Sequence, residues 1–146
     1  MRGKDKIGVR CTFRIYLEEG EKRRKVEEKD VITDAGLKHA VKLLAGIETT
    51  PFKYIAVGTG AAPESETDTR LENEIAREMA TAEYIEFAKV KFSSKFSWDE
   101  DITICEAGLF NESENGVMFA RIVFPSLLVP ACLYVIVEFE VSLGRA

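Results

Sequence analysis

Alternating apolar and polar positions dominate the start of the chain and predict a long β-strand. Over residues 7–17 every second residue is apolar, and mostly polar residues stand between them. A period of two is the side-chain period of a strand with one buried face. A turn at residues 18–21 and a charged segment at 22–28 follow. They predict a hairpin whose second strand lies at a sheet edge, where charge discourages unwanted pairing.

The apolar spacing then changes to that of a helix over residues 35–45. Leu37, Val41 and Leu44 recur three and four residues apart, with Ala40 beside them. This spacing places the four side chains along one stripe of an α-helix.

The ends of this helix also have sequence signals. Thr33 or Asp34 is expected to cap its first turn, and Gly46 is expected to end it. His39, the single histidine of the chain, lies beside the apolar stripe with no cysteine close to it in sequence. We therefore expect a surface or partly packed side chain rather than a ligand or catalytic base.

The remainder of the chain is strand-like, with one exception. Strands are predicted at residues 52–57, 84–98, 102–110, 117–124 and 131–143. Leu71, Ile75 and Met79 have helical spacing and predict a second short helix, which Asp68 would cap. Together these elements predict one mainly β (α+β) domain over residues 1–146. We expect an antiparallel β-sandwich or curved sheet with one or two short helices.

Glycines mark the places where the predicted strands turn or pack closely. Gly58 and Gly60 flank Thr59 after a strand and allow a sharp turn or the close approach of another chain. Gly108 follows Ala107 inside a strand and predicts a bulge or a close backbone contact. Residues 111–116 end in Asn-Gly at Gly116 and predict a hairpin.

Composition narrows the range of functions. The net charge of −5 gives no concentrated basic face for nucleic acid. No apolar run reaches the length of a membrane span, and no secretory signal is expected at the charged N-terminus. Cys11, Cys105 and Cys132 form an odd set without metal-ligand spacing. We expect all three to be buried free thiols in a reducing compartment.

No motif predicts catalysis, a metal or a cofactor. The pair of glycines at 58 and 60 lacks the third glycine of a dinucleotide-binding turn, and Pro63 stands where its helix would run. Glu64, Glu66 and Asp68 alternate in a polar loop without the spacing of a calcium-binding EF-hand. We therefore expect a protein that is not an enzyme, although calcium or a partner at this loop stays open.

Five short pieces of the sequence occur in an order that resembles a known family. They are Ile32-Thr33-Asp34-Ala35-Gly36-Leu37, Tyr54-Ile55-Ala56-Val57-Gly58-Thr59-Gly60, Asp68-Thr69 with Leu71 and Glu74, Glu106-Ala107-Gly108-Leu109-Phe110-Asn111, and Met118-Phe119-Ala120-Arg121 with Val123-Phe124-Pro125. Over residues 31–143 this pattern is similar to that of small virion structural proteins of tailed viruses, often described as tail-fibre-like. The chain is richer in Glu and Lys than that family, which would suit a heat-adapted host.

The resemblance implies a virion protein that is made in the host cytoplasm and works through protein–protein interfaces. Its motif residues Gly58, Gly60, Glu106, Gly108, Asn111 and Gly116 would be structural. Its partners would be other virion proteins and further copies of itself, with a trimer favoured, and neither nucleic acid nor a membrane.

The subunit contact is expected where apolar residues remain after the core is assigned. The candidates are Leu127, Leu128 and Val129 in a predicted loop at 125–130, and Tyr134 and Ile136 on the second face of the last strand. Three functions stay open: a tail, fibre or baseplate component, a capsid decoration protein that binds the assembled shell, and a small cellular enzyme or ligand-binding domain.

Overall fold

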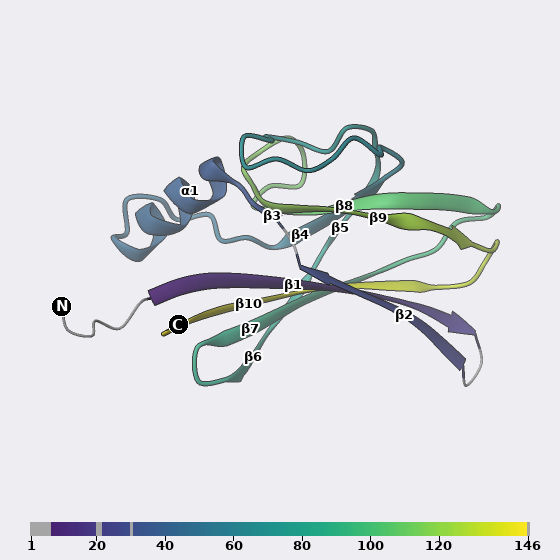
Figure 1. Cartoon of the computed structure of the whole chain (residues 1–146), viewed down its shortest axis with the longest axis horizontal. Coiled ribbons are helices and arrows are strands. Elements are labelled where there is room, and N and C mark those ends of the chain that lie inside the picture. Colours follow the sequence, from purple (N-terminus) through teal and green to yellow (C-terminus); the bar gives the residue numbers. More distant parts are fainter. Residues whose placement is uncertain (1–6, 20–21, 30, 146) are drawn as a thin grey trace.

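The structure confirms a mainly β fold. The computed structural model describes residues 7–19, 22–29 and 31–145, and over these residues the chain forms ten strands and one helix (Figure 1). One group of strands comprises β1 (Ile7–Glu19), β2 (Lys22–Lys29), β6 (Thr81–Glu86), β7 (Lys89–Phe96) and β10 (Val135–Arg145). The other comprises β3 (Val31–Ile32), β4 (Tyr54–Gly58), β5 (Glu74–Met79), β8 (Ile102–Phe110) and β9 (Met118–Val129). The helix is α1 (Asp34–Leu44).

These strands form two antiparallel sheets that pack face to face. Over the described residues the first sheet has the order β2-β1-β10-β7-β6, and the second has the order β3-β9-β8-β4-β5. The chain crosses between the sheets four times, from β2 to β3, from β5 to β6, from β7 to β8 and from β9 to β10. The helix α1 lies at the end of the sandwich where β1 begins and β10 ends (Figure 1). The predicted antiparallel β-sandwich is therefore confirmed.

The core consists of apolar side chains from the facing sides of the two sheets. Phe13 of β1 stacks on Phe124 of β9 with 5.1 Å between ring centroids, and Phe139 of β10 lies 5.4 Å from Phe13. Phe13 and Phe139 are fully buried. The alternation in the first and last strands therefore predicted the buried face correctly over residues 11–17 and 135–139, whereas Val9 and Leu143, on the same faces, are exposed.

Three predicted elements differ from the structure. The second helix is wrong: residues 74–79 form the edge strand β5, and Asp68 caps no helix. The single strand predicted at 84–98 is two strands, β6 and β7, joined at Phe87. Residues 125–129 belong to β9 rather than to a loop.

Pro125 is tolerated inside β9 because the pairing with β8 is interrupted there. Glu106 pairs with Val123 and Ile104 pairs with Leu127, which leaves residues 124–126 outside the regular register. A proline has no backbone N–H to donate, so such an interruption is where a strand accepts it. The predicted turn at residues 18–21 includes positions 20 and 21, which lie outside the described residues.

The helix begins and ends where the sequence predicted. The Thr33 hydroxyl accepts a hydrogen bond from the Gly36 N–H at 2.8 Å and donates one to the Met118 carbonyl at 2.5 Å. Gly46 follows the helix with a φ of +72°, the left-handed conformation that glycine adopts without a steric cost.

The face of α1 that packs on the sheet is not the predicted apolar stripe. Gly36 and His39 are the buried residues of α1, and Ala40 is partly buried against the core, whereas the other three side chains of the stripe are exposed. Leu37, Val41 and Leu44 are 44%, 61% and 81% exposed. Helical spacing therefore predicted the helix correctly, but it did not predict that most of the apolar stripe would be exposed.

His39 is buried, so the prediction of a surface or partly packed histidine is wrong. Its Nε2 lies 2.7 Å from the Thr50 carbonyl oxygen, and its ring meets the Phe52 ring edge-on at 5.2 Å. Since a carbonyl oxygen only accepts, this contact requires the proton on Nε2. The histidine thus fixes the segment after α1 against the helix.

Replacement of Gly36 by alanine tests how tightly α1 packs on β9. A Cβ at Gly36 would lie 2.6 Å from the Phe119 Cα and 2.8 Å from its carbonyl oxygen, both in the backbone of β9. Helix propensity alone favours alanine by about 1 kcal/mol. We expect the steric conflict to prevail, so that Gly36→Ala lowers the free energy of unfolding by about 1–3 kcal/mol in urea denaturation.

Gly8→Ala in β1 is the matched control, because nothing lies within 4 Å of its Cβ position. It should be neutral or slightly stabilising. An increase in stability for Gly36→Ala would show that the helix is not held this closely.

Candidate functional site

The loop at residues 59–73 covers the outer face of the second sheet. It is the loop above β8 and β9 in Figure 1, and it contains neither helix nor strand. Beneath it, the buried Leu71 packs with Ala56, Phe110 and Met118 in a small core separate from the one between the sheets. This loop carries most of the residues that the sequence singled out, so its attachment to the sheet is the first feature to explain.

Glu106 of β8 binds both ends of this loop. Its side chain is fully buried. Oε2 accepts hydrogen bonds from the N–H of Gly60 and the N–H of Asn73, both at 2.8 Å, and Oε1 accepts one from the N–H of Glu72 at 2.9 Å. Because Gly60 lies at the start of the loop and residues 72 and 73 lie at its end, one carboxylate closes the loop.

Arg121 of β9 neutralises this buried carboxylate and extends the network to the middle of the loop. Its Nε and Nη2 donate to Glu106 Oε1 at 3.1 and 3.0 Å, and its Nη1 donates to Asp68 Oδ2 at 3.1 Å. Arg121 is 2% exposed. Such charge-assisted hydrogen bonds are stronger than neutral ones. We call the group Gly60, Asp68, Glu72, Asn73, Glu106 and Arg121 the carboxylate clasp.

Gly58 and Gly60 are required by close approach to the clasp rather than by their backbone angles. A Cβ at Gly58 would lie 2.3 Å from the Asn73 carbonyl oxygen. A Cβ at Gly60 would lie 2.3 Å from the Glu72 Cβ and 2.6 Å from Glu106 Oε2. The sequence predicted a turn or the approach of another chain, and the group that approaches here belongs to the same chain.

The other predicted motif residues lie beside the clasp or close the adjacent hairpin. A Cβ at Gly108 would lie 3.0 Å from both Leu71 Cδ2 and Met118 Sδ, so this position is a close contact under the loop. The register shifts of β8 against β9 fall on either side of it, between Ile104 and Glu106 and between Leu109 and Phe110.

Asn111 and Gly116 hold the hairpin between β8 and β9. The buried Asn111 accepts the Val117 N–H on Oδ1 at 2.7 Å and donates from Nδ2 to Thr50 Oγ1 at 3.0 Å. Asn115 and Gly116 have φ angles of 53° and 75°, in the left-handed region that Asn and Gly adopt most readily. The hairpin prediction is confirmed.

The residues predicted to form the subunit contact do not all lie on the surface. Leu127 and Val129 are buried in the core of the monomer, so the prediction that they contact a partner is wrong. Leu128 and Tyr134 are about half exposed, at 50% and 48%, and Ile136 is partly buried. The strand period explains the split, because successive residues of β9 point to opposite faces.

The acidic side chains of the loop accept hydrogen bonds from the same chain. Glu64 Oε2 accepts the Val123 N–H at 2.6 Å, and Asp68 Oδ2 accepts the Ser65 N–H at 2.9 Å in addition to its bond from Arg121. Within the described part of the chain, no three His, Cys, Asp or Glu side chains gather in a group that would hold a metal ion. The Glu106 carboxylate accepts five hydrogen bonds from described residues, so both of its oxygens are occupied by groups of the same chain.

Comparisons of this chain with protein families, with curated proteins and with solved structures found no match. No helix formed by the described residues is long and apolar enough to cross a membrane.

The sequence reasoning did not recognise Arg121 and Glu106 as partners, although a signal was available. Each is a single charged residue within an apolar run, Ile104-Cys105-Glu106-Ala107 and Phe119-Ala120-Arg121-Ile122. Charged residues in doubly buried strands must be paired, and these two have opposite signs on strands joined by a hairpin. That combination predicts a buried ion pair.

Loss of the charge at Glu106 should destabilise the whole domain. Glu106→Gln keeps the shape of the side chain but leaves the Arg121 guanidinium uncompensated and replaces one acceptor oxygen with a donor. We expect the free energy of unfolding to fall by about 3–5 kcal/mol, the range for breaking a buried ion pair. Urea denaturation at neutral pH measures it.

Glu100→Gln, at an exposed position in the turn between β7 and β8, is the control and should change stability by less than about 0.5 kcal/mol. Equal stability of the two variants would mean that the clasp contributes nothing to the fold.

Cysteine reactivity gives an independent test of the packing under the loop. Cys105 is buried with its Sγ 3.2 Å from the carbonyl oxygens of Thr59 and Gly60. Burial raises the pKa of the Cys105 thiol, and the carboxylates of Glu106 and Glu72 raise it further against the opposing charge of Arg121. The thiol is therefore both inaccessible and held in its unreactive protonated form.

At pH 8, a thiol reagent should modify Cys132 quickly and Cys105 only after unfolding. Cys132 is exposed with a φ of +67°, which contradicts its predicted burial, whereas Cys11 is buried as predicted. Mass spectrometry of peptides after timed labelling distinguishes the three sites. Rapid native-state labelling of Cys105 would show that the loop does not stay closed.

Proposed function

We propose that this chain is a structural component of a tailed-virus particle that works through protein–protein interfaces, at the tail, fibre or baseplate. The observation that carries the proposal is the carboxylate clasp. Sequence pieces that lie far apart, around residues 58–60, 68–74, 106 and 121, supply the groups that meet in it. They are the pieces on which the resemblance to virion proteins rests.

The chemistry of the clasp supports a structural role for those pieces. Its carboxylates and guanidinium are satisfied by one another and by backbone N–H groups, so they stabilise the loop instead of facing a substrate. A rigid domain with an internally satisfied polar network suits a part that is repeated in a particle and acts through its surface. The sequence implies self-association and contact with other virion proteins, and we retain both as part of the proposal.

Immunogold electron microscopy tests the location directly. An antibody raised against the purified chain should label tailed particles produced in the host, at the tail end, and prior incubation with the purified chain should remove the label. Labelling spread over the capsid surface would replace the tail assignment by the decoration role. Unlabelled particles from cells that contain the chain in the cytoplasm would overturn the virion proposal.

A further inference from the structure

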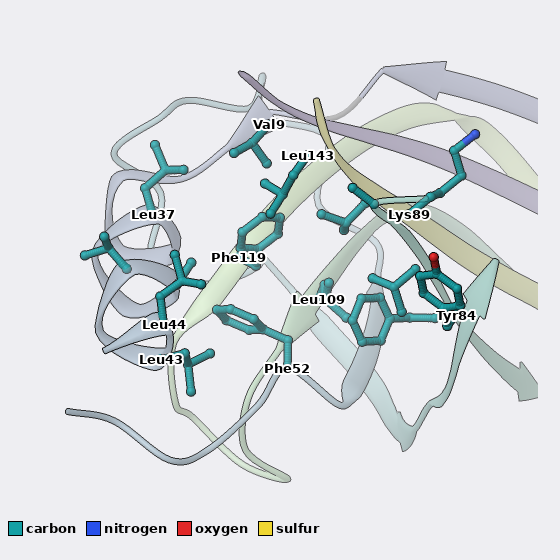
Figure 2. A pocket seen from close by; sticks show the side chains of 16 residues that line it. Val9, Leu37, Leu43, Leu44, Phe52, Tyr84, Lys89, Leu109, Phe119 and Leu143 are labelled. Atoms are coloured by element: carbon teal, nitrogen blue, oxygen red, sulfur yellow. The ribbon is translucent and has the colours of Figure 1, made fainter. Parts of the chain in front are cut away.

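An apolar groove opens at the end of the sandwich that α1 occupies. It has a volume of about 630 Å³, and buried Phe52, Leu109 and Phe119 lie at its base. Figure 2 shows Leu43 and Leu44 of α1 on one side of it and Tyr84 and Lys89 of the β6–β7 hairpin on the opposite side. Lys89 is the one charged side chain among the described residues that line it.

The rim of this groove exposes far more apolar surface than scattered single residues would. On the helix side, Val41 and Leu44 are 61% and 81% exposed, and on the hairpin side Tyr84 is 69% exposed. Val9 and Leu143, from the beginning of β1 and the end of β10, join the two sides. A contiguous apolar patch on a water-soluble surface marks a place of interaction.

Phe87, at the tip of the hairpin, adds a second and independent sign of a partner. Its φ is +47°, a conformation that costs a bulky residue free energy, and its side chain is 79% exposed. The Tyr84 hydroxyl donates to the Phe87 carbonyl at 2.6 Å and holds the turn in this shape. Within a single chain the Phe87 ring stays largely in water.

The exposed side chains beside the two sides of the groove differ in charge, and Lys89, which lines the hairpin side, is paired with Glu140 at 3.7 Å. Lys38 and Lys42 are exposed on α1 beside the apolar stripe, and Glu83 and Glu86 are exposed on β6. Glu83 also lies 3.7 Å from Lys91 on the neighbouring strand, so Glu86, next to Phe87, is the acid best placed for an external cation. A surface that is basic on one side and acidic on the other is complementary to itself after rotation.

We infer that a second copy of this chain occupies the groove, with the Phe87 hairpin of one copy against the α1 side of the next. A rotation axis through the mouth of the groove brings the acidic hairpin onto the basic helix in each pair. Because this axis is a two-fold axis, the contact is isologous and closes as a dimer instead of growing into a filament. This inference rests on the self-association that the proposed function includes, but not on the virion location.

A small apolar molecule would explain less of the surface. It would fill the base of the groove, yet it would leave the Phe87 ring and the outer part of Leu44 in water. It would also give no role to the opposite charges of α1 and β6. A second copy covers all three features at once.

Light scattering after size exclusion, over a range of chain concentrations, tests the inference with three matched substitutions. The wild-type chain should be a discrete oligomer. Phe87→Asp and Val41→Asp should be monomers at concentrations where the wild type is assembled. Leu128→Asp should assemble like the wild type. Leu128 is near the end of β9, at the opposite end of the sandwich from α1 (Figure 1), and its exposure of 50% is close to the 61% of Val41.

Thermal unfolding separates loss of contact from loss of folding. Asp adopts positive φ more readily than Phe, so Phe87→Asp should relieve strain and should not lower the melting temperature of the monomer. If Phe87 contributed to the fold of the single chain, the substitution would instead lower the melting temperature.

Charge reversal identifies which sides meet. Lys42→Glu and Glu86→Lys should each weaken assembly, by about two- to five-fold in the dissociation constant at low salt, and a chain with both should recover it. Failure of the double variant to recover would contradict the pairing of helix with hairpin.

Two outcomes would overturn the inference as a whole. One is a wild-type chain that stays monomeric at every concentration. This outcome would overturn the inference whether or not native mass spectrometry detects a co-purified apolar molecule. The other is assembly that Leu128→Asp abolishes and Phe87→Asp does not. The virion location fails separately. An oligomer with unlabelled virus particles would refute the location alone, and a monomer with labelled particles would refute this contact and the self-association but not the location.

Discussion

The buried ion pair between Glu106 and Arg121 is the interaction on which the second sheet and its covering loop depend. A carboxylate removed from water costs several kcal/mol unless it is paired and fully hydrogen-bonded. Here the compensating groups come from the start, the middle and the end of the loop and from β9. None of these groups alone offsets the free-energy cost of burying the charge, so all of them must be in place. The loop and the sheet are therefore expected to fold together.

This cooperation explains how a long irregular loop can lie within a compact domain. A segment without secondary structure loses conformational entropy on folding and gains few regular hydrogen bonds in return. In residues 59–73 the Thr59 N–H donates to the Asn73 carbonyl at 3.0 Å, and Leu71 fills the small core beneath. The ends of the loop are therefore fixed to each other and to Glu106, so it behaves as part of the sheet.

The strands with one buried face were predictable because their period is local information. Alternation identified β1 and β10, and Asn-Gly identified the hairpin after β8. The edge strand β5 was missed because Ile75 and Met79, four residues apart, also fit a strand of even period. Both are exposed, so no buried face distinguished the two readings. Pairing with β4 decides the outcome, and that is non-local.

The site was only half predictable for the same reason. The glycines at 58 and 60 indicate that another group packs closely against the backbone, but the sequence does not identify that group. The answer lies in Asn73, Glu72 and Glu106, which tertiary pairing brings together. Likewise, the spacing of Leu37, Val41 and Leu44 identifies an apolar stripe without revealing that the stripe remains exposed beside a groove.

The clasp and the apolar groove are connected through the position of α1. The Asp34 N–H, at the start of α1, donates to the Glu66 carbonyl of the loop at 2.8 Å, and the Thr33 N–H donates to the Phe119 carbonyl of β9 at 2.9 Å. Val31, just before the helix, pairs with Arg121 in the sheet. Since α1 forms one side of the groove, the geometry of the proposed contact depends on a network on the opposite face of the same sheet. A chain whose clasp had not formed would lack a correctly placed helix, and assembly would then select for folded subunits.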